Sequence, residues 1–205
     1  LARLQVALEL ARSKGSGEIE GELARIGSEA ERLNAMIGEV LTLARMETGE
    51  QPGTHSRLAL DALLANVVED ACFEAEASGR QVRLEHCEKA DVHGDPALLH
   101  SALDNVIRNA IRHTPADTAV DVSLTCQENM AAIAVCDHGP GVPEQNLARL
   151  FEPFFRTPDS GGQTSDGFGL GLAIAHRAVQ LHQGSIRAEN HADGGLLVCL
   201  SLPLA

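Results

Sequence analysis

The sequence contains no tryptophan and no tyrosine, and aromatic residues make up only 2% of its 205 positions. Aliphatic side chains must therefore fill the core. A chain of this length can form one ordinary domain plus an extension, each with a buried core. The sequence also lacks any run of about eighteen apolar residues that could span a bilayer, and it opens without a signal-peptide pattern. We expect a soluble piece, which leaves membrane spans in a longer parent open.

Basic residues are scarce, because 16 lysines and arginines stand against 29 aspartates and glutamates, for a formal charge of -13. No basic stripe with interleaved aromatics is present, so we expect no nucleic-acid partner. No Cys-x-x-Cys pair occurs among the five cysteines. Their odd number and apolar neighbours predict reduced core cysteines in a cytosolic compartment, without a disulfide framework or a zinc site. These cysteines are Cys72, Cys87, Cys126, Cys136 and Cys199.

The first 49 residues have the apolar spacing of paired helices. A short seam from Leu1 to Ala11 is broken at 13–17, and a longer seam then alternates steps of four and three, as in a coiled coil. Its members are Ile19, Leu23, Ile26, Ala30, Leu33, Ile37, Val40 and Ala44. We predict an antiparallel hairpin over 1–49 that pairs with a second copy into a four-helix bundle. The alternative is a solitary helical arm packed on its own domain.

A linker is expected over 50–57, and residues 58–205 mix helical and strand patterns without a repeating βαβ order. The apolar periodicity predicts helices at 58–78, 96–113 and 170–182. It predicts strands at 81–86, 91–93, 119–125, 131–136, 185–188 and 196–202. The fold class is therefore α+β, a helical hairpin followed by an α/β sandwich with a layer of helices on one mixed sheet.

Between two of these segments, residues 139–167 are rich in Gly, Pro and Asp and carry only a brief helical pattern near 146–151. A loop of this length inside a compact domain usually has a function, such as covering a ligand. It contains three of the five phenylalanines, Phe151, Phe154 and Phe155. Exposed aromatics in such a loop are expected to dock on something.

A glycine-rich stretch leads into the last predicted helix, Gly167-Phe168-Gly169-Leu170-Gly171-Leu172. Glycine lets backbone N–H groups approach a ligand closely, and a helix N-terminus carries partial positive charge. Together these features predict a phosphate cradle. Taken alone, the same pattern also fits a helix start that only packs closely.

The predicted helix at 96–113 carries Asn105, Asn109, Arg112 and His113 on one face beside its apolar side. An amide oxygen is a suitable ligand for Mg²⁺, which takes its other ligands from water and phosphates. Arg112 and His113, one turn further on, could neutralise those phosphates. A solvated polar face is the alternative for each of these residues.

Another polar motif follows a predicted apolar strand, Asp137-His138-Gly139-Pro140-Gly141-Val142. A carboxylate at a strand end can accept a hydrogen bond from an exocyclic amine such as that of adenine. The two glycines would let the chain turn tightly around the base. An ordinary strand-exit turn explains the motif equally well when it is considered alone.

Along the chain, the asparagine helix is followed by the Asp137 turn, the phenylalanine-rich segment and the glycine-rich stretch. In this order and at these separations, the four motifs resemble the ATP-binding domain of bacterial sensor histidine kinases. The resemblance covers essentially the whole chain, because the N-terminal hairpin is similar to the family's dimerisation and phosphotransfer domain. The start at Leu1-Ala2-Arg3-Leu4-Gln5 and the helix around Asn105 look most like Cpx-type envelope-stress sensors of proteobacteria. The resemblance implies a sandwich of the Bergerat or GHKL ATPase type for 58–205.

The resemblance also implies roles for individual residues. It implies that Asn109 holds Mg²⁺, that Asn105, Arg112 and His113 surround the phosphates of ATP, and that Arg156 meets the γ-phosphate during transfer. It implies that Asp137 reads the adenine N6 amine while Gly139, Gly141 and Val142 shape the base pocket. The triphosphate would be wrapped by the backbone of the stretch Gly167, Phe168, Gly169, Leu170, Gly171 and Leu172. Catalysis would depend on Asn105, His113 and Arg156.

At the level of the whole protein, the resemblance implies the cytoplasmic portion of a bacterial inner-membrane kinase that is anchored only through upstream segments. Such a kinase works as a homodimer. It transfers the γ-phosphate of Mg-ATP to a histidine on the hairpin, and the phosphate then passes to an aspartate on a response-regulator receiver domain.

The sequence departs from the family pattern in two ways. Phe168 stands where a small hydroxyl residue is usual, so a contact to phosphate is missing unless Thr164 or Ser165 supplies it. None of the nine histidines is followed by the family's phosphoacceptor motif, His-Glu-Leu-Arg-x-Pro-Leu. If Leu1 corresponds to the last leucine of that motif, the acceptor lies about six residues upstream, under two helical turns away.

Three other functions compete with the kinase. Related ATPases of this sandwich carry a glutamate where Asn105 stands, and an amide is a poor general base, so we expect no efficient hydrolysis of ATP. Anti-sigma-factor serine kinases share the sandwich but lack a long heptad hairpin. A nucleotide-responsive dimerisation module without phosphotransfer of its own is the alternative outside the enzymes.

Overall fold

The computed structural model describes residues 19–48, 55–157, 167–192 and 194–205. The chain divides into two compact units, residues 1–44 and 45–205. Within the described ranges, no helix combines the length and the apolar character that crossing a bilayer requires. The predicted short helix before residue 12 and most of the predicted linker lie outside the described residues.

The long helix predicted near the N-terminus is confirmed as α2, which runs from Ile19 to Thr48. Several apolar side chains of this helix are exposed, among them Leu23 and Ile37, each 55% exposed, and Val40 at 38%. These three belong to the predicted seam. An apolar seam left open to water favours a further helix as its partner. The pairing into a four-helix bundle stays a prediction.

The second unit is built on a mixed five-stranded sheet in the order β2-β4-β5-β7-β6. The strands are β2 (Gln81–Cys87), β4 (Ala119–Gln127), β5 (Met130–Cys136), β6 (Ser185–Asn190) and β7 (Leu196–Pro203). Only β2 and β4 run parallel, while the other neighbours are antiparallel. Along β4, β5 and β7 buried and half-exposed residues alternate, so one face of the sheet carries the core.

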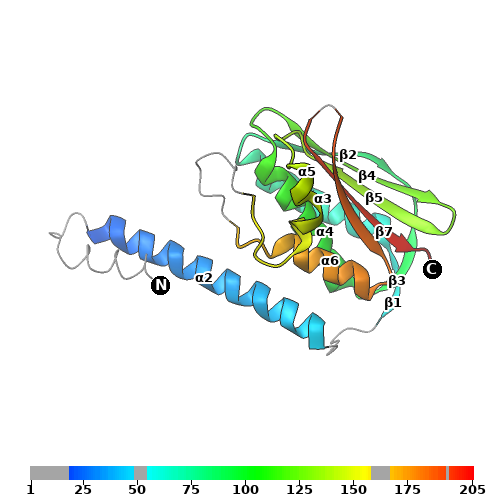
Figure 1. Ribbon diagram of the computed structural model, residues 1–205, viewed down its shortest axis with the longest axis horizontal. Helices are drawn as coiled ribbons and strands as arrows, with labels where there is room; N and C mark the ends of the chain where they lie inside the picture. Colours follow the sequence, from blue (N-terminus) through cyan, green and yellow to red (C-terminus); the bar gives the residue numbers. More distant parts are fainter. Residues whose placement is uncertain (1–18, 49–54, 158–166, 193) are drawn as a thin grey trace. The chain divides into compact units, whose positions relative to one another are not determined.

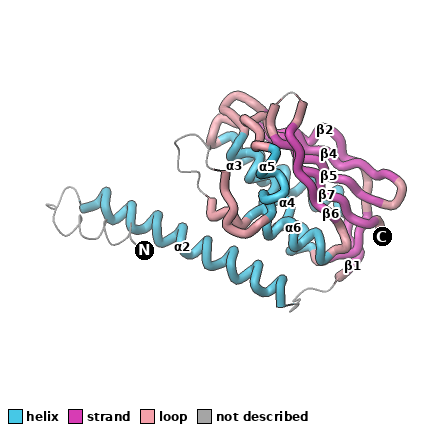
Figure 2. The backbone as a smooth tube through the Cα atoms, viewed as in Figure 1, coloured by secondary structure: helices cyan, strands magenta, loops and turns pink. Residues whose placement is uncertain are grey.

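Three helices cover that face, α3 (Leu60–Glu76), α4 (Pro96–His113) and α6 (Gly171–Leu181), as Figures 1 and 2 show. Leucine, isoleucine, valine and alanine make up almost all of the buried apolar side chains. Two short helices, α5 (Glu144–Leu147) and η1 (Ala148–Phe151), interrupt the long loop after β5. The predicted α/β sandwich with one helical layer is confirmed.

One predicted element begins in the wrong place. The helix expected from residue 58 starts at Leu60, and the four residues before it form strand β1 (Ser56–Ala59), so this strand also takes in the last two residues of the predicted linker. β1 pairs antiparallel with β3 (Asp91–Gly94), with Leu58 opposite Val92. Leu58 lies two residues before Leu60, which is a strand-like spacing, and it falls outside the helical stripe that begins at Leu60, so the predicted helix started two residues too early.

Candidate functional site

Helix α4 carries the two asparagines, and its ends are fixed by local sequence. Asp95 caps the N-terminus, where its Oδ1 accepts from the backbone N–H groups of Ala97 at 2.8 Å and Leu98 at 3.3 Å. Pro96 occupies the first turn, where its missing N–H costs nothing. The helix stops at His113, and Pro115 follows two residues later. The predicted bounds of this helix are therefore confirmed.

Asn105 lies half-buried where α4 meets the start of α6. Its Nδ2 donates to the backbone oxygen of Ser101 at 2.8 Å, which leaves Oδ1 directed towards Gly171. A Cβ added to Gly171 would lie 2.7 Å from that Oδ1. The glycine therefore permits the approach of the two helices at this point. Asn109, one turn along α4, is also half-buried.

Arg112 and His113 extend the same side of α4 towards the glycine cradle, residues 167–171. A Cβ on Gly167 would lie 3.2 Å from Cζ of Arg112, so the guanidinium rests directly on the first glycine of the cradle. Burial lowers the pKa of His113, while Asp137 acts in the opposite direction and Arg112 reinforces the shift. At neutral pH the His113 imidazole is therefore uncharged, and the positive charge here comes from Arg112.

Asp137 is the most buried carboxylate of the site, with 2% of its surface exposed. Its Oδ1 accepts from the backbone N–H groups of Gly139 at 2.9 Å and Leu196 at 3.1 Å. Burial raises the pKa of Asp137, and these two hydrogen bonds oppose that shift. Because both bonds use Oδ1, the second oxygen, Oδ2, is the one left to accept from a ligand.

The turn after Asp137 is held from three directions. A Cβ on Gly139 would lie 2.6 Å from the backbone oxygen of His113, so only glycine lets this turn pass the end of α4. Gly141 has a φ of 72°, a conformation that favours glycine. The Asn190 side chain accepts from the N–H of Val142 at 2.8 Å and donates to its carbonyl at 2.7 Å. The turn is therefore tied to the end of β6.

The glycine cradle is bound to the phenylalanine segment, residues 151–156. Gly169 has a φ of 72°, and its carbonyl accepts from the N–H of Phe154 at 2.8 Å. A Cβ on Gly169 would lie 2.7 Å from the backbone oxygen of Phe155. The phenylalanine segment therefore crosses directly over the middle glycine.

The side chains of the cradle point in different directions. Leu170 is fully buried and Leu172 is 9% exposed, so both belong to the core. They could contact a ligand only through their backbone. Phe168 is half-buried. Thr164 and Ser165, the predicted substitutes for its missing hydroxyl, lie outside the described residues.

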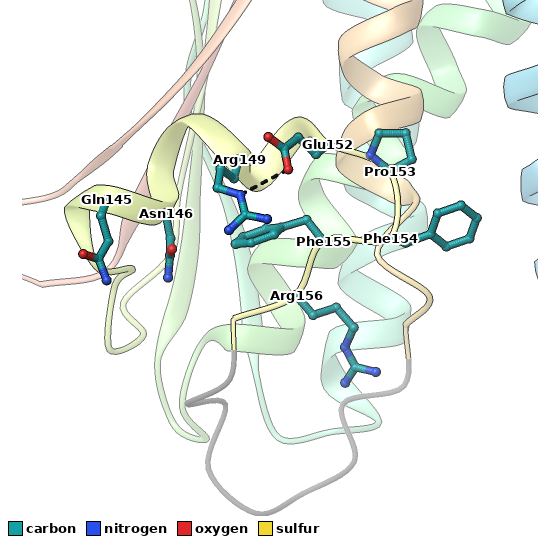
Figure 3. A pocket seen from close by; sticks show the side chains of 8 residues that line it. All are labelled: Gln145, Asn146, Arg149, Glu152, Pro153, Phe154, Phe155 and Arg156. Atoms are coloured by element: carbon teal, nitrogen blue, oxygen red, sulfur yellow. Dashed lines mark hydrogen bonds and ion pairs between the residues drawn. The ribbon is translucent and has the colours of Figure 1, made fainter.

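A hollow of about 580 Å³ lies beside the phenylalanine segment. Figure 3 shows the side chains that line it, which are Gln145, Asn146, Arg149, Glu152, Pro153, Phe154, Phe155 and Arg156. The Arg149 guanidinium lies 4.3 Å from the centre of the Phe155 ring and donates to Glu152 at 3.2 Å. The Arg156 side chain extends away from this pair (Figure 3). The hollow does not include the asparagines of α4 or Asp137, so it adjoins the site rather than forming its centre.

We expected the phenylalanines of the long loop to dock on other parts of the protein, and two of the three do so. The Phe151 ring packs at 5.4 Å against the His176 ring of α6, and Phe155 stacks with Arg149. Phe154 is 56% exposed.

Three residues that support the site escaped the sequence interpretation. Asn190 holds the turn at Val142, and Thr114 is 1% exposed with its hydroxyl 3.4 Å from the N–H of His138. Gly195, with a φ of 93°, lets the chain leading into β7 pass close to the backbone of Asp137. For Asn190, the sequence offered a single signal. The last predicted strand but one ended at residue 188, and extending it by two residues would have placed Asn190 at the strand end.

Comparison with known proteins bears on this arrangement. The sequence model of the "Histidine kinase-, DNA gyrase B-, and HSP90-like ATPase" family matches residues 94–205, which contain every side chain of the site. The chain belongs to this family. The matched part of the chain is accordingly an ATP-binding domain of that family.

Individual members of the family narrow the comparison. The chain is 36% identical over 205 residues to the sensor histidine kinase CpxA of Escherichia coli K12, covering all of this chain and 44% of CpxA. It is 35% identical over 212 residues to the sensor histidine kinase TrcS of Mycobacterium tuberculosis, covering 41% of TrcS. The chain thus spans less than half the length of these relatives. The predicted resemblance to Cpx-type sensor kinases is confirmed.

A solved structure agrees with the sequence relatives. The mycobacterial sensor histidine kinase MprB superposes with a TM-score of 0.65 and 28% identity, over 74% of this chain and 98% of that chain.

Proposed function

We propose that this chain is the catalytic part of a two-component sensor histidine kinase, which binds Mg-ATP and transfers the γ-phosphate to a histidine. One observation carries the proposal. Three segments far apart in the sequence, the polar side of α4, the turn after Asp137 and the glycine cradle, meet at the C-terminal half of α4. The similarity to CpxA over the whole chain supports the kinase among the members of this family.

The arrangement of the site supports a role for each residue within this proposal. Asp137 reads the adenine amine through Oδ2, and Gly139, Gly141 and Val142 form the turn around the base. The backbone of residues 167–172 wraps the triphosphate, with Arg112, Arg156 and His113 around it. When bound, Mg²⁺ would supply positive charge that neutralises the phosphates. The described side chains contain no cluster of three His, Cys, Asp or Glu fit for a metal, so the ion would rest on Asn109, water and the phosphates.

The side chains near the proposed phosphate site fit phosphotransfer better than hydrolysis of ATP. A general base must accept a proton from the attacking water, and an uncharged amide is a poor acceptor. At Asn105 the amide nitrogen is bound to Ser101 and the oxygen lies against α6. Asn105 therefore serves to position the nucleotide, and the transfer depends on positioning and charge neutralisation.

The exposed seam of α2 supports the remaining parts of the proposal. Residues 1–49 form the hairpin, which pairs with a second copy through that seam, and residues 58–205 form the catalytic domain. The hairpin surface receives the response-regulator receiver domain. The parent protein is an inner-membrane kinase whose cytoplasmic portion includes this chain.

The decisive experiment is incubation with ATP labelled on the γ-phosphate. The chain lengthened upstream by about ten residues, to include the predicted acceptor, is compared with the chain as it stands. We expect acid-labile, base-stable label on the lengthened chain, as for phosphohistidine, and none on the shorter chain. Replacing Asn109 by Ala in the lengthened chain should remove the label.

Three results would contradict the kinase. Absence of label on a lengthened chain that still binds Mg-ATP would leave the nucleotide-responsive dimerisation module as the function. Rapid steady-state hydrolysis that disappears in Asn105→Ala would instead assign an ATPase. Label on serine would point to the anti-sigma type of kinase.

A further inference from the structure

His182 is a buried titratable residue that the proposed mechanism does not use. It follows the last turn of α6 and is 4% exposed. Its two ring nitrogens have separate partners. Nδ1 lies 2.6 Å from the backbone oxygen of Ala178, and Nε2 lies 2.9 Å from the backbone nitrogen of Asp95.

These partners determine the tautomer. A carbonyl oxygen can only accept, so Nδ1 carries the proton, and the N–H of Asp95 can only donate, so Nε2 is the acceptor. Gly94 lets the ring come this close, because a Cβ there would lie 2.7 Å from Nε2. The ring of His55 stacks on His182 with centroids 5.1 Å apart and planes 9° apart. The imidazole is therefore held on both edges and covered on one face.

α4 and α6 pack closely against each other. The hydrogen bond from Asp95 to His182 is a polar contact where α4 begins, and Asn105 Oδ1 lies against Gly171 where α6 begins. Along α4, ten residues separate Asp95 from Asn105, about 15 Å of helix, and along α6 eleven residues separate Gly171 from His182, about 16 Å. α4 therefore begins near the end of α6, and α6 begins against the middle of α4, so the two helices run antiparallel over this stretch of nearly equal length.

We propose that His182 is a positioning residue that sets the register of α6 against α4, and thereby the spacing between the glycine cradle and the asparagines of the nucleotide site. The inference rests on the proposed function, because it assigns His182 a part in holding that same site. An imidazole with one donor and one acceptor joins the carbonyl end of α6 to the cap of α4. Losing it removes the polar contact that fixes the end of α6 against the start of α4, so that α6 shifts along its apolar packing and the shift reaches the cradle at the start of α6.

Protonation should weaken the same connection. An imidazolium has no acceptor at Nε2, so the hydrogen bond from Asp95 is lost. Burial lowers the pKa of His182, the bond to Ala178 acts against that shift, His55 reinforces it and Asp95 opposes it. The folded chain thus favours the neutral ring, and its contribution to stability is complete above the usual value of 6.5 and is lost as the pH falls below it.

The test uses four variants of the chain. His182→Ala removes both bonds, His182→Asn keeps a donor near Ala178, and His182→Gln can place an acceptor near Asp95 without titrating. His93→Gln, on the exposed side of β3, controls for the loss of a histidine. We expect Mg-ATP affinity to fall about tenfold in His182→Ala, as for a lost buried hydrogen bond, and to stay within about twofold of wild type in His182→Gln.

Two further readouts separate positioning from general stability. Long-range proton–nitrogen NMR of the nucleotide-free chain should show His182 protonated at Nδ1, and His182→Ala should shift the amide signals of Asn105 and Gly171. Between pH 7.5 and 5.5 the wild type should lose Mg-ATP affinity more steeply than His182→Gln, since the titration of ATP itself is common to both. A ring protonated at Nε2, or a lowered melting temperature with unchanged affinity and unchanged Gly171 signals, would overturn the inference.

A failure of the proposed function would look different. If the wild type binds no Mg-ATP, the kinase is contradicted, while the tautomer and the Gly171 signals still decide whether His182 fixes the two helices.

Discussion

The two ends of the proposed nucleotide site are built in different ways. At the end proposed for adenine, Asp137 is buried, and its carboxylate is fixed by hydrogen bonds from two segments of backbone. At the end proposed for the phosphates, Arg112 packs on Gly167, Asn105 lies against Gly171, and the N–H of Phe154 donates to the carbonyl of Gly169. Arg112 and Arg156 are both exposed. At the Asp137 end, one carboxylate is held in place. At the glycine cradle, long cationic side chains and glycine backbone are available to a ligand.

This difference matches what each end would bind. A flat base is distinguished by one directed hydrogen bond, which requires a fixed acceptor. A triphosphate changes shape and charge during transfer, and long arginines can follow it. Substitutions at the adenine end should therefore act on base recognition, and substitutions at the phosphate end on the response to Mg²⁺ and to the number of phosphates.

The largest expected effect is that of Asp137→Asn. The amide oxygen can still accept from Gly139 and Leu196, but the amide nitrogen then faces the donor on adenine. We expect Mg-ATP affinity to fall about 100-fold, as for loss of a hydrogen bond to a charged group, when measured by calorimetry. Because burial raises the pKa of Asp137, removing its charge should leave the melting temperature unchanged or higher. A lower melting temperature with unchanged affinity would assign Asp137 a purely structural role.

Asn109→Ala should have the next largest effect, and only when Mg²⁺ is present. Loss of a metal ligand should weaken Mg-ATP binding roughly tenfold, with little change when a chelator is added. Asn129→Ala, in the exposed turn before β5, serves as the control. If Asn109→Ala lowers nucleotide affinity equally with and without Mg²⁺, Asn109 is not a ligand of the metal.

Gly169→Ala tests whether the cradle depends on its crossing by the phenylalanine segment. Alanine at a φ of 72° is strained, and its Cβ would press on Phe155. Gly79→Ala is a matched control, because Gly79 has a φ of 68° with nothing within 4 Å of an added Cβ. Each variant should lose about 1 kcal/mol or more of stability. Only Gly169→Ala should also weaken binding of ATP more than that of ADP.

Phe168→Ser should give the smallest effect, and in the opposite direction. It restores the hydroxyl usual at this position, and one new hydrogen bond should raise Mg-ATP affinity by roughly threefold to tenfold. Phe168→Ala separates the added hydroxyl from the lost ring. If serine and alanine behave alike, the hydroxyl has no phosphate contact here.

The sequence predicted best those features that are encoded locally. The bounds of α4 were predicted from its apolar periodicity, and in the structure they coincide with local signals, the cap at Asp95, Pro96 in the first turn and Pro115 after the end. The positions of the glycines followed from their spacing, and the structure brings Gly167 against Arg112 and Gly171 against Asn105. Both contacts join the glycine cradle to α4, and the sequence analysis had predicted that these two segments belong to one site.

Features that depend on distant partners were missed. Strand β1 is only four residues long and pairs with β3, about thirty-five residues later, so its extended form is set by that partner. Asn190 reaches the turn at Val142 from a different strand, across 48 residues of sequence. His182 had been placed only at the end of a helix, and nothing local indicated its bond to Asp95.

The central claim, that Asp137 reads the adenine of a bound nucleotide, is tested most directly by comparing Mg-ATP with Mg-ITP in one titration experiment. Inosine carries a carbonyl where adenine carries its N6 amine, so Oδ2 of Asp137 would face an acceptor instead of a donor. We predict that the wild type binds ATP at least about tenfold more tightly than ITP, and that Asp137→Asn loses this preference. Equal affinities of the wild type for the two nucleotides would contradict the account.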